Sequence, residues 1–286
     1  MKKKWLLFVA AIMTAVVLAA CGTADDEKTS SGGESSDGSG EEKQVLKVGM
    51  EAGYAPFNWS QSDNSNGAVP ISGSKEFAAG YDVEIAKRIA EGLNMELEVV
   101  KTDWDGLIPS LQSGAIDLVI AGMSPTKDRK EVIDFTENYY VSDYVIVVKA
   151  DGKYADAKSI HDFAGAKITG QQATTHYDVI DQMEGVKKEV AATDFGAMRV
   201  QLMSGAIDGY VSERPEGISA EMALENIKYI VPEPSFEADE ASTAVAVGLK
   251  KGSALTEDIN KVLAEITEEE RQQLMEDAIA NQPAAQ

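Results

Sequence analysis

The sequence contains little cysteine, little histidine and fewer basic than acidic side chains. Its single cysteine, Cys21, can form neither an intramolecular disulfide nor a cysteine-based zinc site. Two histidines, His161 and His176, are too few for a histidine-rich metal centre, so we expect no metal and no cofactor. The net charge of -22 argues against a nucleic-acid partner and against electrostatic docking onto anionic lipid. An acidic surface of this kind keeps a protein soluble, and steering of cationic ligands is a secondary possibility.

The first residues have the pattern of an export signal. Lys2, Lys3 and Lys4 precede an apolar run over residues 5–20, which is short for a span of about 20 apolar residues. The run ends in Leu-Ala-Ala followed by Cys21, which resembles a bacterial lipoprotein signal. This resemblance implies a signal peptide over 1–20, lipidation (palmitate) of Cys21 and an extracytoplasmic, lipid-anchored protein at the cell membrane. An ordinary signal peptide with a chance cysteine is the alternative.

Residues 21–44 predict a tether. The segment is rich in Gly, Ser, Asp and Glu, and it offers too little apolar surface to offset the entropy of ordering. We therefore expect a flexible acidic Gly/Ser tether between the anchor and a soluble body.

From Val45 onward the pattern predicts alternating strands and helices. We expect a strand over 45–50, a turn-rich segment over 53–80, a helix over 81–93 and a strand over 97–100. A helix over 104–112, capped by Asp103, and a strand over 116–122 follow. This alternation is typical of an α/β fold whose sheets are mostly parallel and flanked by helices.

An internal repeat predicts two such units. Residues 111–122 read LQSGAIDLVIAG, and residues 202–213 read LMSGAIDGYVSE. In both, a helix end and a Ser-Gly turn precede a short strand, and the glycines suit left-handed helix C-caps. The preceding segments 105–109 and 195–199 also correspond. The alternative explanation is that such a sequence is common wherever a helix leads into a strand, but we infer two α/β lobes of related design.

The topology predicts a cleft that fits a zwitterion. In open α/β sheets, ligands bind beyond the carboxyl ends of the strands, which here lead into residues 122–126 and 212–215. If the lobes face each other, Arg129 lies on one wall and Glu213 on the other. A guanidinium pairs with a carboxylate, and an acid accepts an ammonium.

An ordered series of short motifs then carries a family resemblance. It runs through GYAPF at 53–57, GYDVEIA at 80–86, DGLIPSL at 105–111, DLVIAGMS at 117–124 and TKDR at 126–129. In this order the motifs resemble the polar amino-acid solute-binding proteins of ABC transporters, family 3, over about 45–279. The resemblance implies a two-lobed periplasmic-binding-protein fold (type II) with two hinge crossings, near residues 145–148 and 244–247. It places lobe 1 at 45–144 plus 240–286 and lobe 2 at 145–239.

The same resemblance implies residues that hold the main-chain part of an amino acid. Arg129 matches the arginine that pairs with the α-carboxylate. Gly122 and Ser124 match positions that contact the ligand backbone, and Thr174 and Thr175 match a threonine pair that offers hydroxyl and N–H groups at a helix start.

The remaining matches concern the ammonium and the side chain of the ligand. Glu213 matches the acid that accepts the α-ammonium. Tyr54 and Trp104 match an aromatic pair that holds the ligand side chain, and Glu51 matches an often acidic position near the end of that side chain. Glu51 and the aromatic walls favour arginine or lysine, while glutamine or another neutral polar amino acid is the alternative.

The sequence departs from the family pattern at several positions. Ala173 stands where many members have glycine, and alanine tolerates a positive φ poorly. Glu213 stands where aspartate is frequent, and residues 60–77 form a longer segment, which is either a cleft-edge loop or a surface insertion. His176, which follows the threonine pair, is interpreted as a surface helix residue.

The expected function is capture by closure and delivery to a membrane transporter. The expected partners are a free L-amino acid, an ABC transporter permease and the membrane, the last through Cys21, and we expect a monomer. We expect no catalysis, although some proteins of this fold are dehydratases of small cyclic carboxylates. Such chemistry needs a positioned acid or base, and the sequence offers no convincing candidate beyond Glu213. A surface adhesin or sensor is the third alternative.

Overall fold

The computed structural model describes residues 43–283. These residues belong to one compact part of the chain, which contains two large sheets; each sheet with its helices is called a unit below, the first holding β1 and the second β9. The signal peptide, Cys21 and all but the last two residues of the expected tether lie outside the described residues. Within 43–283, no helix combines the length and the apolar character that a membrane crossing requires.

The first sheet has five strands in the order β6-β1-β7-β14-β8. Strand β1 lies between β6 and β7 and is parallel to both, while β14 is antiparallel to β7 and β8. The bounds of these strands are β1 Val45–Met50, β6 Glu96–Lys101, β7 Leu118–Val119, β8 Asp134–Val141 and β14 Ala244–Leu249. The alternating apolar residues of the segment 45–50 explain β1, because Leu46 and Val48 are buried on one face.

The second sheet repeats this arrangement, in the order β11-β10-β12-β9-β13. Strand β10 is parallel to β11 and β12, and β9 is antiparallel to β12 and β13. The bounds are β9 Tyr144–Lys149, β10 Lys167–Thr169, β11 Lys187–Lys188, β12 Gly209–Glu213 and β13 Ile227–Ile230. Each sheet therefore has three parallel strands followed by two strands in antiparallel contact, which is the mixed, mostly parallel architecture expected from the sequence.

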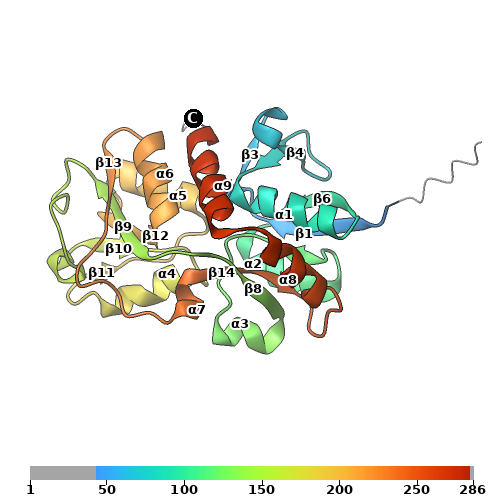
Figure 1. The fold of residues 1–286 in the computed structure, drawn as a ribbon. Helices are drawn as coiled ribbons and strands as arrows, with labels where there is room; N and C mark the ends of the chain where they lie inside the picture. The colour runs from blue at the N-terminus through green and yellow to red at the C-terminus, as the bar shows by residue number, and fades with distance from the viewer. Residues whose placement is uncertain (1–42, 284–286) are drawn as a thin grey trace, which may run out of the picture. The chain divides into compact units, whose positions relative to one another are not determined.

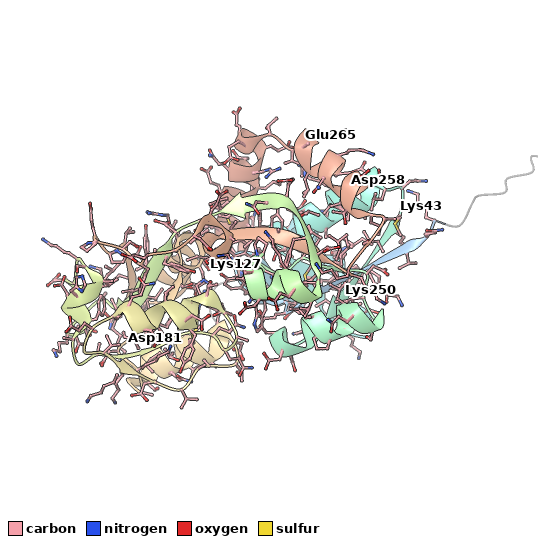
Figure 2. The ribbon with its side chains drawn as sticks, turned by 90° about the horizontal axis from the view of Figure 1, so that it is seen from below. Lys43, Lys127, Asp181, Lys250, Asp258 and Glu265 are labelled. Carbon is pink, nitrogen blue, oxygen red and sulfur yellow. The ribbon has the colours of Figure 1, made fainter. Side chains whose placement is uncertain are left out.

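Helices pack against both sheets, as Figure 1 shows for α1, α2 and α8 beside the first sheet and for α5 and α6 beside the second. Their bounds are α1 Tyr81–Gly92, α2 Trp104–Ser113, α3 Lys127–Val132, α4 Thr175–Asp178, α5 Phe195–Ser204, α6 Arg214–Ala223, α7 Glu240–Thr243, α8 Thr256–Glu265 and α9 Glu268–Asn281. Three short 3-10 helices lie at η1 Ser65–Gly67, η2 Ile160–Phe163 and η3 Val179–Gln182. Charged side chains such as Lys127, Asp181 and Asp258 lie exposed on these helical layers (Figure 2).

The repeated SGAID segment has the same structure in both units. Gly114 and Gly205 end α2 and α5 in the left-handed conformation, with φ of 84° and 77°. Asp117 then accepts a hydrogen bond from the Lys47 N–H at 2.9 Å, and Asp208 accepts one from the Lys167 N–H at 2.8 Å. The repeat is therefore a structural unit that ties the segment after a helix end to the neighbouring parallel strand, β1 or β10, of its sheet, which confirms two sheets of related design.

The sequence prediction is incomplete in one detail and wrong in two. The segment 53–80 is turn-rich as expected, but it also holds a small antiparallel sheet in the order β2-β3-β5-β4. Its strands are β2 Gly53–Tyr54, β3 Asn58–Gln61, β4 Val69–Pro70 and β5 Phe77–Ala79. Strand β7 is shorter than the expected 116–122, and Asp103 occupies the N-cap position of α2 without a side-chain capping hydrogen bond.

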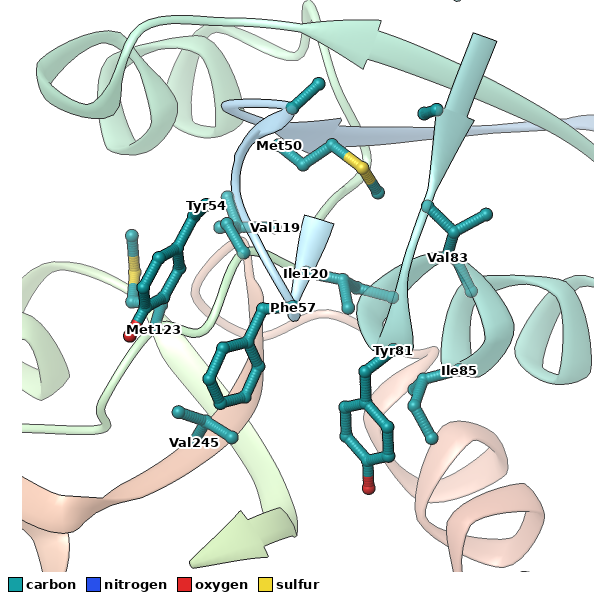
Figure 3. Close-up of a cluster of buried hydrophobic side chains, with 14 of the residues drawn as sticks. Met50, Tyr54, Phe57, Tyr81, Val83, Ile85, Val119, Ile120, Met123 and Val245 are labelled. Atoms are coloured by element: carbon teal, nitrogen blue, oxygen red, sulfur yellow. The ribbon is translucent and has the colours of Figure 1, made fainter. Parts of the chain in front are cut away.

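The chain passes between the two large sheets twice. The first passage is at residues 142–143, between β8 and β9, and the second lies between β13 and β14. The expected hinge segments 145–148 and 244–247 lie just after these passages, inside β9 and β14. A buried cluster that includes Phe57, Tyr81 and Val245 packs beneath the small sheet and the start of α1 (Figure 3).

Candidate ligand-binding site

Most of the predicted ligand residues follow the strand ends of the two large sheets. Glu51 follows β1, Gly122 follows β7, Thr174 follows β10, and Glu213 is the last residue of β12. Side-chain hydrogen bonds join the first-sheet elements to the second-sheet elements in this region. They include Tyr54 to Glu213, Arg129 to Ala173 (2.9 Å), Gln171 to Glu51 (2.9 Å), Gln172 to Asp105 (2.6 Å) and Thr175 to Ser242 (3.1 Å). The strand ends of both units therefore face one common region.

Arg129 spans this region with its guanidinium group. Nη1 donates to the Ser124 carbonyl at 2.8 Å, and Nη2 donates to the Ala173 carbonyl at 2.9 Å. The guanidinium carbon lies 5.1 Å from the centre of the Trp104 ring, within cation–π range. Burial lowers the pKa of Arg129 to about 10. Among residues 43–283, no carboxylate lies within 4.0 Å of the guanidinium, so carbonyl dipoles and the Trp104 ring contact its charge directly, while Asp178 acts on it from a longer distance.

A pocket of about 360 Å³ opens beside Arg129. Its lining comes from α2, α3, α4 and the segments that precede α3 and α4, and includes Trp104, Arg129, Thr174, Thr175 and Asp178. Four of the nine predicted ligand residues thus share one pocket, and its volume suits a small molecule.

The hydroxyl groups of the predicted site donate hydrogen bonds to main-chain carbonyls. Thr174 donates to the Gln171 carbonyl at 2.7 Å, while Thr175 and Ser124 donate to the Ser242 carbonyl at 3.1 Å and 3.3 Å. A hydroxyl has only one proton to donate, so these groups offer a carboxylate no donor while those bonds last. The expected hydroxyl contacts with a ligand therefore require a change of partner.

Ala173 precedes this threonine pair with a φ of 53°. The left-handed conformation expected to suit glycine is adopted here by alanine, at a cost of about 1 kcal/mol. The left-handed turn at Ala173 directs its carbonyl to Arg129, which donates a hydrogen bond to it.

Glu213 lies buried at the N-cap of α6. Its Oε1 accepts a hydrogen bond from the Tyr54 hydroxyl and lies 3.8 Å from Nε2 of His176. Burial raises the pKa of Glu213 to about 8, although the Tyr54 hydrogen bond acts in the opposite direction. No lysine or arginine in the described part of the chain lies within 4.0 Å of this carboxylate. Glu213 is thus a desolvated acid without a cation.

Tyr54 is packed differently from the expectation. Its ring stacks on Phe57 on one side and on Phe195 on the other, with centroid distances of 5.0 Å and 4.2 Å. Figure 3 shows Tyr54 beside Phe57 in the buried cluster. Both ring faces are therefore occupied by protein, and Tyr54 reaches the site through its hydroxyl group. Of the predicted aromatic pair, Trp104 alone lines the pocket within the described residues.

Gly122 supports the same packing. Its φ is 60°, and a Cβ atom there would lie 2.8 Å from Cε1 of Tyr54. Its N–H donates to the Tyr139 hydroxyl at 3.3 Å. Gly122 therefore allows Tyr54 to approach the backbone, and its own N–H is already paired.

Glu51 meets Gln171 across the region between the two sheets. The amide nitrogen of Gln171 donates to Oε1 of Glu51 at 2.9 Å and to the Thr193 carbonyl at 3.2 Å. Burial raises the pKa of Glu51 to about 8, the Gln171 hydrogen bond lowers it, and Asp194, Asp103 and Asp105 raise it further. The other oxygen, Oε2, is buried without a hydrogen-bond partner in the range 43–283. Glu51 therefore retains an unused acceptor in an acidic environment.

His176 is not the surface residue expected from the sequence. It is 9% exposed, and its ring contacts Tyr144 and Phe195 edge-on at 5.6 Å and 6.0 Å between centroids. Burial, with a contribution from Arg129, lowers the pKa of His176 to about 4. The reason for the error is tertiary, because α4 is only four residues long and packs beside β12.

Comparison with known proteins identifies the family. The model of the bacterial extracellular solute-binding proteins, family 3, matches residues 46–279. The chain belongs to this family. The arginine-binding extracellular protein ArtP of Bacillus subtilis is 29% identical over 278 residues, which cover 92% of each chain.

Solved structures of this family have the same two-lobed fold. An amino acid ABC transporter substrate-binding protein from Streptococcus pneumoniae, bound to L-arginine, superposes with a TM-score of 0.72 at 29% identity, covering 82% of this chain and 94% of that one. An ancestral amino-acid-binding protein, described as a precursor of cyclohexadienyl dehydratase, reaches 0.68 at 25% identity, with coverage of 82% and 95%. The α/β fold expected from the sequence is therefore confirmed.

Three site residues were missed by sequence reasoning, namely Gln171, His176 and Phe195. The internal repeat held a signal for the last of them, because α2 and α5 each begin with an aromatic residue after Thr-Asp, at Trp104 and Phe195. The helix correspondence drawn from the sequence was shifted by one residue. With the shift corrected, Trp104 of the first unit corresponds to Phe195 of the second, and each unit contributes one aromatic residue to the region between the sheets.

Proposed function

We propose that the protein captures one free amino acid between its two lobes and delivers it to an ABC transporter permease. The observation that carries this proposal is a pair of ionisable groups of opposite sign, neither of which has a Lys, Arg, Asp or Glu partner within 4.0 Å among residues 43–283. Arg129 has a half-buried guanidinium that contacts carbonyls and a ring, and Glu213 has a buried carboxyl group that contacts a hydroxyl group and ionises when a cation reaches it. A desolvated charge is stabilised strongly by an opposite charge. An amino-acid zwitterion supplies one of each sign in a single small molecule.

The proposed contacts follow from this charge arrangement. The α-carboxylate pairs with Arg129, which faces the pocket, and the α-ammonium binds Glu213. Thr174 and Thr175 line the same pocket and contribute main-chain N–H groups, while Ser124 and Gly122 shape the wall through backbone contacts.

For the side chain, we propose a cationic amino acid, with arginine or lysine preferred. Glu51 has a buried oxygen without a hydrogen-bond partner among residues 43–283, and burial, together with Asp194, Asp103 and Asp105, raises its pKa, so a cation near it would be favoured. Trp104 adds a ring face beside the pocket, whereas Tyr54 contributes its hydroxyl group. The relatives named above as arginine-binding support this choice. A neutral polar side chain such as that of glutamine remains the alternative, since Glu51 in its protonated form can hydrogen-bond an amide.

Calorimetric titration of the purified protein with L-arginine and L-glutamine tests the proposal. Arg129→Ala should weaken the binding of every amino acid about 30-fold or more, because removal of one partner of a desolvated pair costs about 2–5 kcal/mol. Glu51→Gln should weaken cationic ligands selectively. Lys127→Ala is the matched control, since it removes an exposed charge from the same helix. Unchanged arginine affinity in Glu51→Gln would contradict the side-chain assignment while leaving the amino-acid proposal intact.

The lobe boundaries remain proposals, at 45–144 plus 240–286 and 145–239, with closure about the two passages between the sheets. Ligand that contacts both walls favours the closed population by its differential affinity. Small-angle scattering should show a smaller radius of gyration with ligand than without it. An identical radius in both states would count against closure.

We also propose export, lipidation at Cys21 and an acidic tether over 21–44. Cys21→Ser should release the protein from the membrane fraction while amino-acid binding is retained. A variant that stays in the membrane fraction would show that another segment anchors the chain. We further propose that the protein is a monomer, which sedimentation velocity can check.

The protein is proposed to bind without catalysis. One similar structure is described as a precursor of a dehydratase, so a product assay with prephenate and arogenate is the direct check. Product formation that Glu213→Gln abolishes would favour the enzymatic alternative.

A further inference from the structure

His176 stands beside the predicted ammonium site without a role in the proposal above. It is held in place from two sides, because the rings of Tyr144 and Phe195 contact its imidazole edge-on. Its Nε2 lies 3.8 Å from Oε1 of Glu213, the same oxygen that accepts the Tyr54 hydroxyl. Glu213 is therefore approached from one side by a hydroxyl of the first unit and from the other by an imidazole of the second.

The imidazole is a neutral group in this environment. Burial and Arg129 both oppose its protonation, and they lower the pKa of His176 to about 4. A neutral imidazole has one N–H donor and one acceptor nitrogen. The tautomer with the proton on Nε2 directs that donor to the carboxylate of Glu213. The other nitrogen, Nδ1, is buried with no hydrogen-bond partner among the described residues, and in this tautomer it carries no proton.

Neutrality matters because of the charged and titratable groups that surround the ring. Arg129 acts on it from α3, Glu213 from β12 and Tyr144 from β9. A protonated imidazole at position 176 would itself pair with Glu213, and its charge would repel the ammonium of the ligand. A purely apolar residue would leave the carboxylate without a donor on this side.

We propose that His176 is a positioning residue for Glu213: its neutral Nε2–H orients the carboxylate that receives the α-ammonium of the bound amino acid. The inference rests on the proposed function, and it deepens that function by assigning a further determinant of ammonium recognition. When the ammonium binds Oε1 or Oε2 of Glu213, the 3.8 Å separation shortens to a hydrogen bond, and the acid is fixed between the imidazole and the ligand.

Two substitutions and two ligands test the proposal. The ligands are the amino acid that a thermal-shift screen of the twenty selects, and its 2-hydroxy analogue, which lacks the ammonium. His176→Leu should lower the affinity for the amino acid about tenfold, as expected for one lost hydrogen bond to a charged group. The affinity for the 2-hydroxy analogue should change by less than about twofold, because that ligand makes no ion pair with Glu213.

His176→Gln is the matched control. Its side-chain amide supplies a neutral N–H donor near the position of Nε2, so the affinity for the amino acid should return to within about threefold of the unchanged protein. The melting temperature of His176→Leu should stay at or above that of the unchanged protein, since this substitution removes a buried nitrogen that has no hydrogen-bond partner among residues 43–283.

The outcomes separate the inference from the proposed function. Equal losses for the amino acid and its 2-hydroxy analogue would overturn the inference, because they indicate a general packing role. Unchanged affinity in His176→Leu would overturn it as well. Binding of none of the twenty amino acids by the unchanged protein would instead overturn the proposed function, and the inference with it.

Discussion

Ligand binding should release protons from the two buried acids of the site. Burial raises the pKa of Glu213 to about 8, and burial also raises that of Glu51 to about 8. At pH 7, an acid with a pKa of 8 is about 90% protonated in the empty protein. An ammonium or guanidinium that binds such an acid favours its ionised form, so the proton leaves when the ligand arrives.

The number of protons depends on the ligand. An amino acid with a neutral side chain meets only Glu213 as an ionised partner, so it should release about 0.9 proton at pH 7. Arginine or lysine also places a cation near Glu51, and the release should rise to about 1.8 protons. The sign for affinity follows directly: because the bound state holds fewer protons, affinity should rise between pH 6 and 8 and level off above pH 8.

Isothermal titration at pH 7 in two buffers of different ionisation enthalpy measures this number. The observed enthalpy depends linearly on the buffer ionisation enthalpy, and the slope equals the protons exchanged per ligand. With arginine as ligand, Glu51→Gln should reduce the slope from about two protons to about one. With glutamine as ligand, the same substitution should leave the slope unchanged.

A slope near zero for arginine would refute this reasoning. It would mean that both acids are already ionised in the empty protein, or that the ligand does not contact them. Proton uptake instead of release would contradict the assignment of the ammonium to Glu213 in particular.

Three further predictions concern stability, and chemical denaturation of each purified variant measures them. Gly122→Ala should lower the free energy of unfolding by about 2–4 kcal/mol, because it combines a left-handed backbone with a Cβ atom 2.8 Å from the Tyr54 ring. Gly114→Ala should cost only about 1 kcal/mol, since its φ is also positive but no atom lies within 4 Å, and equal costs would dismiss the Tyr54 contact as the cause. Ala173→Gly should raise stability by up to about 1 kcal/mol through relief of its positive φ, and a loss would show that the backbone there is unstrained. Finally, the pKa of Glu213 is raised from 4.5 to about 8 on folding, so its contribution to stability is present in full below about pH 4.5 and is lost as the pH rises to 8. Glu213→Gln should remove this loss, which is on the order of 4 kcal/mol at pH 8, and a parallel pH dependence in both proteins would contradict it.

Local patterns in the sequence predicted the elements that are stabilised locally. The helix expected over 81–93 is α1 Tyr81–Gly92, and the strand expected over 97–100 is β6 Glu96–Lys101. The repeated SGAID segment was informative because its glycine ends a helix and its aspartate binds the neighbouring strand. Local interactions of this kind can be recognised in a short window of sequence.

The parts that were missed depend on contacts between distant residues. The small sheet over 53–80 has strands of two to four residues, which are too short to show a hydrophobic period. The segment 60–77 belongs to this sheet, whose β2–β3 pair holds Tyr54 in place. Likewise, the burial of His176 depends on Tyr144 and Phe195, which lie in other elements.

In the candidate site, too, the residues could be chosen from the sequence, but their contacts with distant residues could not. Its residues were chosen by family resemblance, and the structure gathers Trp104, Arg129, Thr174 and Thr175 around one pocket. The stacking of Tyr54 on Phe195 was beyond sequence reasoning, because it joins two units that are 141 positions apart along the chain. Residue identity was therefore easier to predict than the partner of each residue.

The central claim is that Arg129 holds the α-carboxylate of a bound amino acid, and one calorimetric cycle tests it most directly. L-Arginine and agmatine, its analogue without the carboxylate, are titrated into the unchanged protein and into Arg129→Ala. We predict that the unchanged protein prefers arginine by about 30-fold or more, and that this preference disappears in Arg129→Ala. Equal affinity of the unchanged protein for both ligands, or a preference that survives in Arg129→Ala, would contradict the claim.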